Sequence, residues 1–120
     1  MRCRLWTIVA TGVLVVASHW GSDFERESHE AAGRACSLTE AELTALRRGS
    51  VPDLKDLNER LAVGTVVALT RNGALTDAEY DEAVKVLGER GLFELTTLAG
   101  YYATLALQLR VFAGEQRDPR

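Results

Sequence analysis

The stretch "GLFELTTLAGYYATLALQLRVF" (residues 91–112) decides the fold class of this chain. Its apolar residues recur with the period of an α-helix and form one stripe: Leu95, Leu98, Ala99, Tyr102, Leu105, Ala106 and Leu109. Only Glu94, Gln108 and Arg110 are strongly polar along its length. A helix this apolar is buried in its domain or against another subunit. Because the chain is small, we expect part of this helix to lie in a subunit interface.

The segment before it, "LTDAEYDEAVKVLGERG" (residues 75–91), also has a helical period. Thr76 and Glu79 have the spacing of a capping box, and Gly91 is expected to end the helix. The expected buried face consists of Tyr80, Ala83, Val84 and Leu87.

Two further helices are predicted upstream. In "SLTEAELTALRRG" (residues 37–49), Thr39 and Glu42 form a second capping box and Gly49 is a stop signal. The segment "DLNERLAVGTVVALTRNG" (residues 56–73) contains β-branched residues that would also suit a strand. We favour a helix there, because the chain offers no convincing second strand to pair with it.

The N-terminus allows two interpretations. "MRCR" followed by "LWTIVATGVLVVA" (residues 5–17) has the outline of a secretory signal peptide: a basic start, a short apolar run and small residues near Ala17. The same run could be a buried core helix, and it is too short to span a membrane. The residues alone favour neither interpretation.

Length and charge narrow the classes of function. A chain of 120 residues supports one domain, which we place at residues 1–120, with an all-α fold of five or so helices. The net charge is −3 and the basic residues are scattered, which argues against nucleic acid as a partner. Cys3, Cys36, His19 and His29 lack the spacing of a metal site, and we expect no metal and no organic cofactor.

The segment "GSDFERESHE" (residues 21–30) holds the candidate site. On a helix, Ser22, Glu25 and His29 form one row, because residues three and four positions apart share a face. An imidazole one turn from a carboxylate suits proton transfer near neutral pH, with His29 as acid or base and Glu25 as its orienting partner. The bland alternative is that Ser22 and Glu25 form a helix cap and His29 lies on the surface. Without further knowledge, the cap is the better interpretation.

These segments resemble a known family. "LVVASHWGSDFERESHEAAGRACSLTEAELTALRRG", "TDAEY" and "LGERGLFELTTLAGYYATLALQLRVF" are similar to the carboxymuconolactone decarboxylase family, from about Leu14 onward. The resemblance implies the AhpD-like helical fold, a homotrimer or homohexamer, a cytoplasmic location and a small-molecule substrate. The decarboxylases keep Glu-x-x-x-His, which Glu25 and His29 match. The resemblance therefore implies a carboxy-lyase that uses His29 and Glu25, and with Ser22 from the same helical row these are the three candidate catalytic residues.

The departures from the family pattern are equally specific. Thiol-dependent alkylhydroperoxidases of the family use Cys-x-x-Cys-x-x-x-His, and Ser22 and Glu25 stand at both thiol positions here. Peroxidase activity of the peroxiredoxin type stays an alternative that would need Cys36 or Cys3. The decarboxylases' Tyr-Ala-Gly-Val-Pro-like turn is replaced by "GYYATLALQL", so the substrate does not carry over. Tyr101 or Tyr102 could still supply a hydroxyl, although a tyrosine in an apolar stripe usually only packs.

The resemblance also bears on the N-terminus. "LWTIVATGVLVVA" matches the family's core helix that precedes the active segment, which favours a core helix over a signal peptide and a cytoplasmic over a secreted protein. Family members commonly have additional N-terminal helices, so we expect that this chain could be a truncated version. A catalytically silent, oligomeric binding protein is the third hypothesis.

Overall fold

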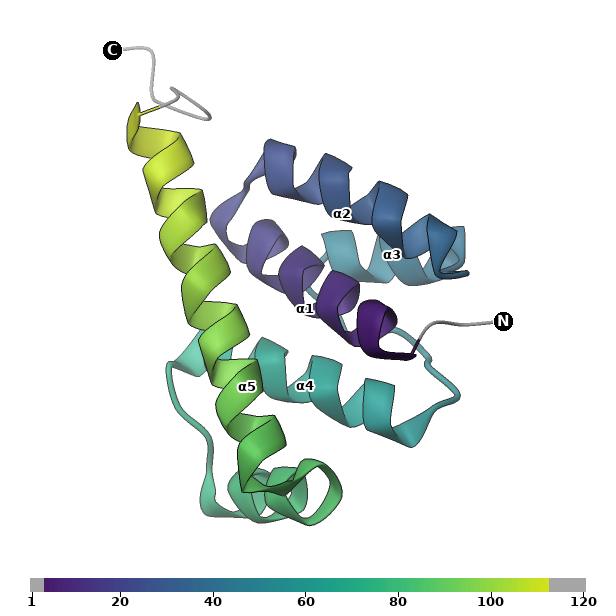
Figure 1. The fold of residues 1–120 in the computed structure, drawn as a ribbon, viewed down its shortest axis with the longest axis vertical. Helices are drawn as coiled ribbons and strands as arrows, with labels where there is room; N and C mark the ends of the chain where they lie inside the picture. Colours follow the sequence, from purple (N-terminus) through teal and green to yellow (C-terminus); the bar gives the residue numbers. More distant parts are fainter. Residues whose placement is uncertain (1–3, 113–120) are drawn as a thin grey trace.

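The structure is a computed structural model that describes residues 4–112 as a bundle of α-helices (Figure 1). The helices are α1 (Arg4–Trp20), α2 (Asp23–Ala35), α3 (Glu40–Arg47), α4 (Leu57–Asn72) and α5 (Asp77–Phe112). Residues 4–112 contain no strand, which confirms the all-α class and the choice of helix over strand for residues 57–72. Within this described range, no helix has the length and apolarity required to cross a membrane.

Helix α1 is the centre of the bundle. It packs against all four other helices, and it lies between α2 and α4 in Figure 1. Its residues from Ala10 to Ala17 are buried, and Val13 is fully enclosed. Its partners include Leu43 and Leu46 of α3 and Val66 of α4, each with no exposed surface. The apolar run at residues 5–17 is thus a core helix in this structure.

Side-chain caps begin the middle helices as the sequence predicts. Both capping boxes form: the Glu42 N–H donates to Thr39 Oγ1 over 3.1 Å, and the Glu79 N–H donates to Thr76 Oγ1 over 3.1 Å. In return, Glu42 and Glu79 accept from the backbone N–H of the capping threonine. A cap that the sequence analysis did not single out is Asp56, which accepts from two N–H groups in the first turn of α4.

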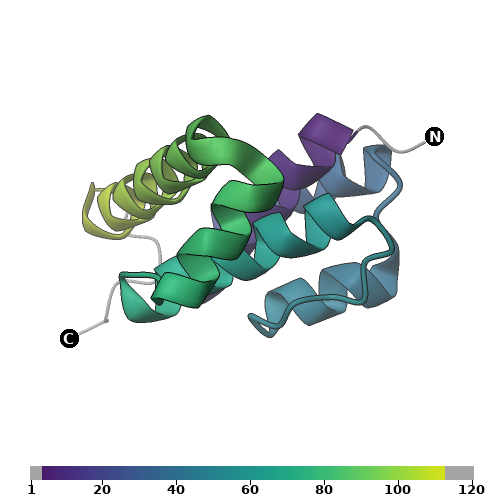
Figure 2. The same ribbon diagram turned by 90° about the horizontal axis from the view of Figure 1, so that it is seen from below.

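Helix α5 has a sharp break at Gly88, where φ is 76° and ψ is 165°. The segment before the break, residues 77–87, runs in a different direction from the segment after it, residues 89–112 (Figures 1 and 2). The prediction that Gly91 ends the first segment is wrong by one turn, because Gly91 continues the helix. Tyr80 was also expected to be buried, yet 45% of its surface is exposed. Of the four residues predicted to form the buried face, only Ala83 is fully buried.

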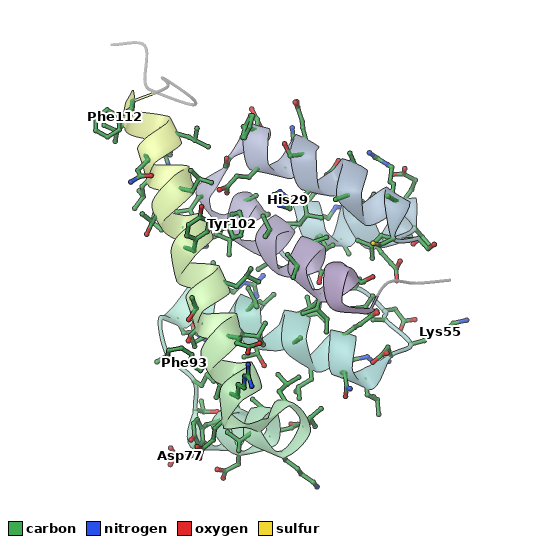
Figure 3. The ribbon with its side chains drawn as sticks, in the orientation of Figure 1. His29, Lys55, Asp77, Phe93, Tyr102 and Phe112 are labelled. Atoms are coloured by element: carbon green, nitrogen blue, oxygen red, sulfur yellow. The ribbon has the colours of Figure 1, made fainter. Side chains whose placement is uncertain are left out.

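The second half of α5 buries only one side. Leu95 and Ala106 are buried against the bundle, while Leu98, Ala99, Tyr102, Leu105 and Leu109 are half-buried. The other side carries large exposed residues, including Phe93 and Phe112, which project outward in Figure 3. The predicted stripe is therefore the inner face of this helix, and a second apolar face remains open.

Candidate functional site

Helix α2 places the predicted row against the bundle. Ser22 and Glu25 are buried, with 2% and 1% of their surfaces exposed, and His29 is half-buried. Phe24, one position from Glu25, is 62% exposed on the other side of the helix. The row thus points inward, so the prediction that Ser22, Glu25 and His29 share one face is confirmed, with His29 half-buried at its end.

Ser22 is the N-cap of α2. Its backbone is extended, and its hydroxyl oxygen accepts a hydrogen bond from the Glu25 N–H over 3.4 Å. The Ser22 N–H donates to the carbonyl of Ala17 at the end of α1, over 2.9 Å. This second bond sets the sharp connection by which α2 folds back along α1. The capping interpretation of Ser22 therefore has direct geometric support.

The ring of His29 is held by the backbone of its own helix. Its Nδ1 lies 3.0 Å from the carbonyl oxygen of Glu25, one turn earlier. A carbonyl oxygen only accepts, so this contact requires a hydrogen on Nδ1, and in the neutral ring Nε2 is then the proton acceptor. The backbone carbonyl of Glu25 thus orients the imidazole. The geometry leaves Nε2 as the nitrogen for proton transfer.

Tyr102 of α5 joins this row from across the bundle. The rings of His29 and Tyr102 meet edge to face, with 5.4 Å between centroids, and both side chains lie between α2 and α5 in Figure 3. The sequence favoured a packing role for Tyr102 and left open that Tyr101 or Tyr102 supplies a hydroxyl. The sequence does indicate that only one of the two tyrosines can face the core, because Tyr101 and Tyr102 are adjacent on a helix. In the structure the exposed one is Tyr101, with 62% of its surface exposed.

Burial is the main reason that the pKa of Tyr102 lies above its usual value. The neighbouring Tyr101 and the charge of Glu25 raise this pKa further. The charge of Glu25 thus acts on the Tyr102 hydroxyl, and the Tyr102 ring is the one that contacts His29. The N-terminus of α2 carries partial positive charge, which favours a carboxylate in its first turn, where Glu25 lies.

A second carboxylate on α2, Glu30, fixes the helix in place. It accepts two hydrogen bonds from Arg47 of α3, over 2.6 and 2.7 Å, and is 6% exposed. These bonds are the main reason that the pKa of Glu30 is lowered, and they outweigh the effect of burial, which acts in the opposite direction. Glu30 follows His29 directly, so this ion pair holds the end of the row. Sequence analysis did not identify it, because the two residues belong to different helices.

The cysteines are not part of the row. Cys36 is buried at the C-cap of α2, the end opposite Ser22, and Cys3 lies outside the described residues. Among residues 4–112, no group of three or more His, Cys, Asp or Glu side chains is arranged to hold a metal ion. The arrangement offers one imidazole, one buried carboxyl and one phenol, which are groups that transfer protons.

Comparisons with known proteins add no assignment to this geometry. No protein-family model matches the chain, and neither the curated proteins nor the solved structures contain a significant match to it.

Proposed function

We propose that this chain is a small-molecule enzyme that transfers a proton through His29, with Glu25 and Tyr102 forming the walls of the site. The observation that carries the proposal is the position of the His29 ring. The ring is half-buried, it is oriented through Nδ1 by the Glu25 carbonyl, and it lies against Tyr102 from another helix. An imidazole oriented in this way needs no rotation before it accepts or donates a proton at Nε2.

The reaction class that we favour is decarboxylation of a small carboxylic acid. Loss of carbon dioxide leaves an electron pair on the substrate, which must spread into a neighbouring carbonyl as an enolate-like state before a proton is returned to carbon. His29 would accept the proton of the substrate's carboxyl group at Nε2 and return it to carbon from the same nitrogen, so that the ring ends the reaction neutral with its hydrogen on Nδ1. The sequence resemblance to carboxymuconolactone decarboxylases supports this choice, and the Glu25-x-x-x-His29 spacing is the part of the resemblance that lies in the row.

Assembly and location belong to the same proposal. The resemblance favours a homotrimer or homohexamer in the cytoplasm. The central position of α1 supports the location, because cleavage near Ala17 would remove the helix against which the other four pack. A secreted protein that kept this fold would have to retain residues 5–17.

The second candidate is a binding protein without catalytic activity, which we call the silent candidate. The Ser22 cap favours it. Both serine and glutamate have structural roles that need no substrate: Ser22 caps α2 through the Glu25 N–H, and Glu25 packs in the interior. In that case the row serves only to start the helix and to position it against α1. The two candidates differ in what His29 does.

The test is the ultraviolet loss of gamma-carboxymuconolactone with wild type, His29→Ala and His19→Ala, with light scattering on every sample. His19 is the matched control, since it is the other histidine and is exposed at the end of α1. We expect turnover by wild type and by His19→Ala, and at least about a hundredfold loss in His29→Ala at equal assembly.

Equal turnover by all three proteins would remove His29 from the mechanism. If none of the intact, assembled proteins turns the lactone over, this substrate is wrong and the silent candidate becomes the better one. Where wild type does turn the lactone over, Tyr102→Phe, which removes only the hydroxyl, separates the two roles of that residue: a fall in rate at unchanged stability indicates a chemical role.

A further inference from the structure

The outer face of the second half of α5 has a regular composition of its own. Six residues on this face follow each other at alternating spacings of four and three, and all six are exposed. We call them the α5 seam: Phe93, Thr97, Gly100, Thr104, Leu107 and Val111. This spacing has the seven-residue repeat with which two helices pack along a shared line.

The α5 seam is unusual for a surface in contact with water, because it bears no charge. Between Glu94 and Arg110 the chain has no charged residue, although the seam side of this segment is exposed. Phe93 is 71% exposed, Leu107 44% and Val111 59%. A helix face exposed in a monomer normally carries charged side chains. A face of this kind marks a contact surface.

We propose that the α5 seam binds the α5 seam of a second copy of this chain, with the two helices antiparallel around a twofold axis at position 102. In that register Phe93 lies opposite Val111 of the partner subunit. Thr97 lies opposite Leu107 of the partner subunit, and Gly100 opposite Thr104 of the partner subunit. The numbers in each pair are equally far from 102, as a twofold axis requires.

The sizes of the side chains favour this direction over a parallel pair. In a parallel, in-register pair Phe93 would meet Phe93 and Gly100 would meet Gly100, so one layer would be crowded and another empty. The antiparallel register instead places a larger side chain opposite a smaller one in each layer, which is how helix faces interdigitate. The antiparallel direction also places the two helix dipoles antiparallel, which is electrostatically favourable. Gly100 has no atom within 4 Å of the place where a Cβ would be, so the second helix has room to approach.

The available area fits a dimer. From their exposed fractions, Phe93, Leu107, Val111 and the adjacent Tyr101 together offer roughly 300–500 Å² of apolar surface. That is about half of the ~800 Å² that each partner contributes to a standard interface. The threonines, Gly100 and Gln108 on the same face supply more. The segment from Phe93 to Val111 is about 27 Å long at the rise of an α-helix, which gives the contact its length.

The α5 seam adjoins the candidate site through two neighbouring tyrosines. Tyr101 borders the α5 seam near the proposed axis, and its ring meets that of Tyr102 edge to face with 5.0 Å between centroids. Tyr102 in turn contacts His29. The rings therefore connect the proposed interface to the row on α2. The proposed pairing stands on the seam alone and does not depend on the reaction assigned to His29.

A charge exchange across the seam tests both the pairing and its direction. Leu107→Glu and Thr97→Lys, made singly, each bury an unpaired charge in the interface and are expected to raise the dissociation constant at least about tenfold in sedimentation equilibrium. In the double variant, the introduced glutamate of each subunit lies opposite the introduced lysine of the other, so two opposite-charge pairs form. We expect the double variant to recover most of the lost affinity. Leu57→Glu is the matched control, since Leu57 is an exposed leucine on α4.

The outcomes separate cleanly when circular dichroism confirms that each variant is folded. A wild type that stays monomeric at high micromolar concentration overturns the proposal, and so does an unchanged assembly in Leu107→Glu. Weakened single variants without recovery in the double variant overturn the antiparallel register. If Leu57→Glu dissociates the protein as well as Leu107→Glu, the interface lies elsewhere. A twofold pair is compatible with a hexamer of three pairs and excludes an isolated trimer.

Discussion

The ring of Tyr102 meets the ring of His29 edge to face, with 5.4 Å between centroids, although the two residues lie in α5 and α2. This contact connects the first third of the chain to its last helix. It also means that the candidate site is not a property of α2 alone. Any change that moves α5 changes the surroundings of His29.

The charge of Glu25 should be measurable at Tyr102. Because burial, Tyr101 and Glu25 all raise the pKa of Tyr102, replacing Glu25 by glutamine removes one of the three causes and should lower that pKa. Ultraviolet titration of tyrosinate follows the change, and Tyr102→Phe identifies which part of the signal belongs to this residue. An unchanged Tyr102 titration in a folded Glu25→Gln protein would contradict this effect of Glu25 on Tyr102.

The N-cap of α2 makes a separate prediction about stability. Ser22→Ala should lower the free energy of unfolding by about 1 kcal/mol, because the Glu25 N–H loses its acceptor, whereas Ser22→Gly should cost only a few tenths. Urea unfolding at neutral pH measures both. Thr76→Ala provides the comparison at an exposed capping box. A Ser22→Ala protein as stable as wild type would show that the 3.4 Å contact contributes nothing.

Local signals in the sequence predicted most of the helices. The boxes at Thr39 and Thr76 depend only on residues within one turn, and both form. The break in α5 was placed at the wrong glycine, since "GERG" offers two glycines and either can adopt a positive φ. Packing selects between them: with the break at Gly88, Leu92 and Leu95 both face the bundle and are buried. That selection involves residues far away in the sequence.

The site shows the same division between local and distant information. Helical spacing alone predicted that Ser22, Glu25 and His29 share a face. It could not show that the face turns inward, because α2 has few apolar residues to indicate its buried side. Tyr102 contacts His29, and Arg47 binds the adjacent Glu30, in both cases from another helix, so no spacing within residues 21–30 points to either partner. These contacts depend on the tertiary fold, which the local spacing does not reveal.

The ion pair of Glu30 and Arg47 should make stability depend on pH in the acid range. Its lowered pKa means that Glu30 binds a proton less readily in the folded than in the unfolded chain, so it stabilises the fold above its ordinary value of 4.5. That contribution is lost as the pH falls through the lower, folded pKa. Glu30→Gln should therefore cost on the order of 1–3 kcal/mol at neutral pH and much less at the acid end.

Urea unfolding of wild type and Glu30→Gln at a series of pH values measures this dependence. The exposed pair of Arg34 and Glu40 is the comparison, because its charges remain in water and its removal should have the smaller effect. A difference between wild type and Glu30→Gln that is constant with pH would mean that the glutamine loses packing rather than charge.

The break at Gly88 should tolerate no side chain. Its φ of 76° and ψ of 165° lie in a region that is open essentially to glycine only, so Gly88→Ala should cost about 1–3 kcal/mol even though no atom lies within 4 Å of the added Cβ. Gly64→Ala is the matched control. Gly64 is helical within α4 and equally unobstructed, so alanine there should stabilise the protein by about 0.5–1 kcal/mol. Thermal unfolding of the two variants should therefore shift in opposite directions. A stabilising Gly88→Ala would mean that residues 77–112 form one continuous helix in solution, and the Tyr102 contact with His29 would then have to be reconsidered.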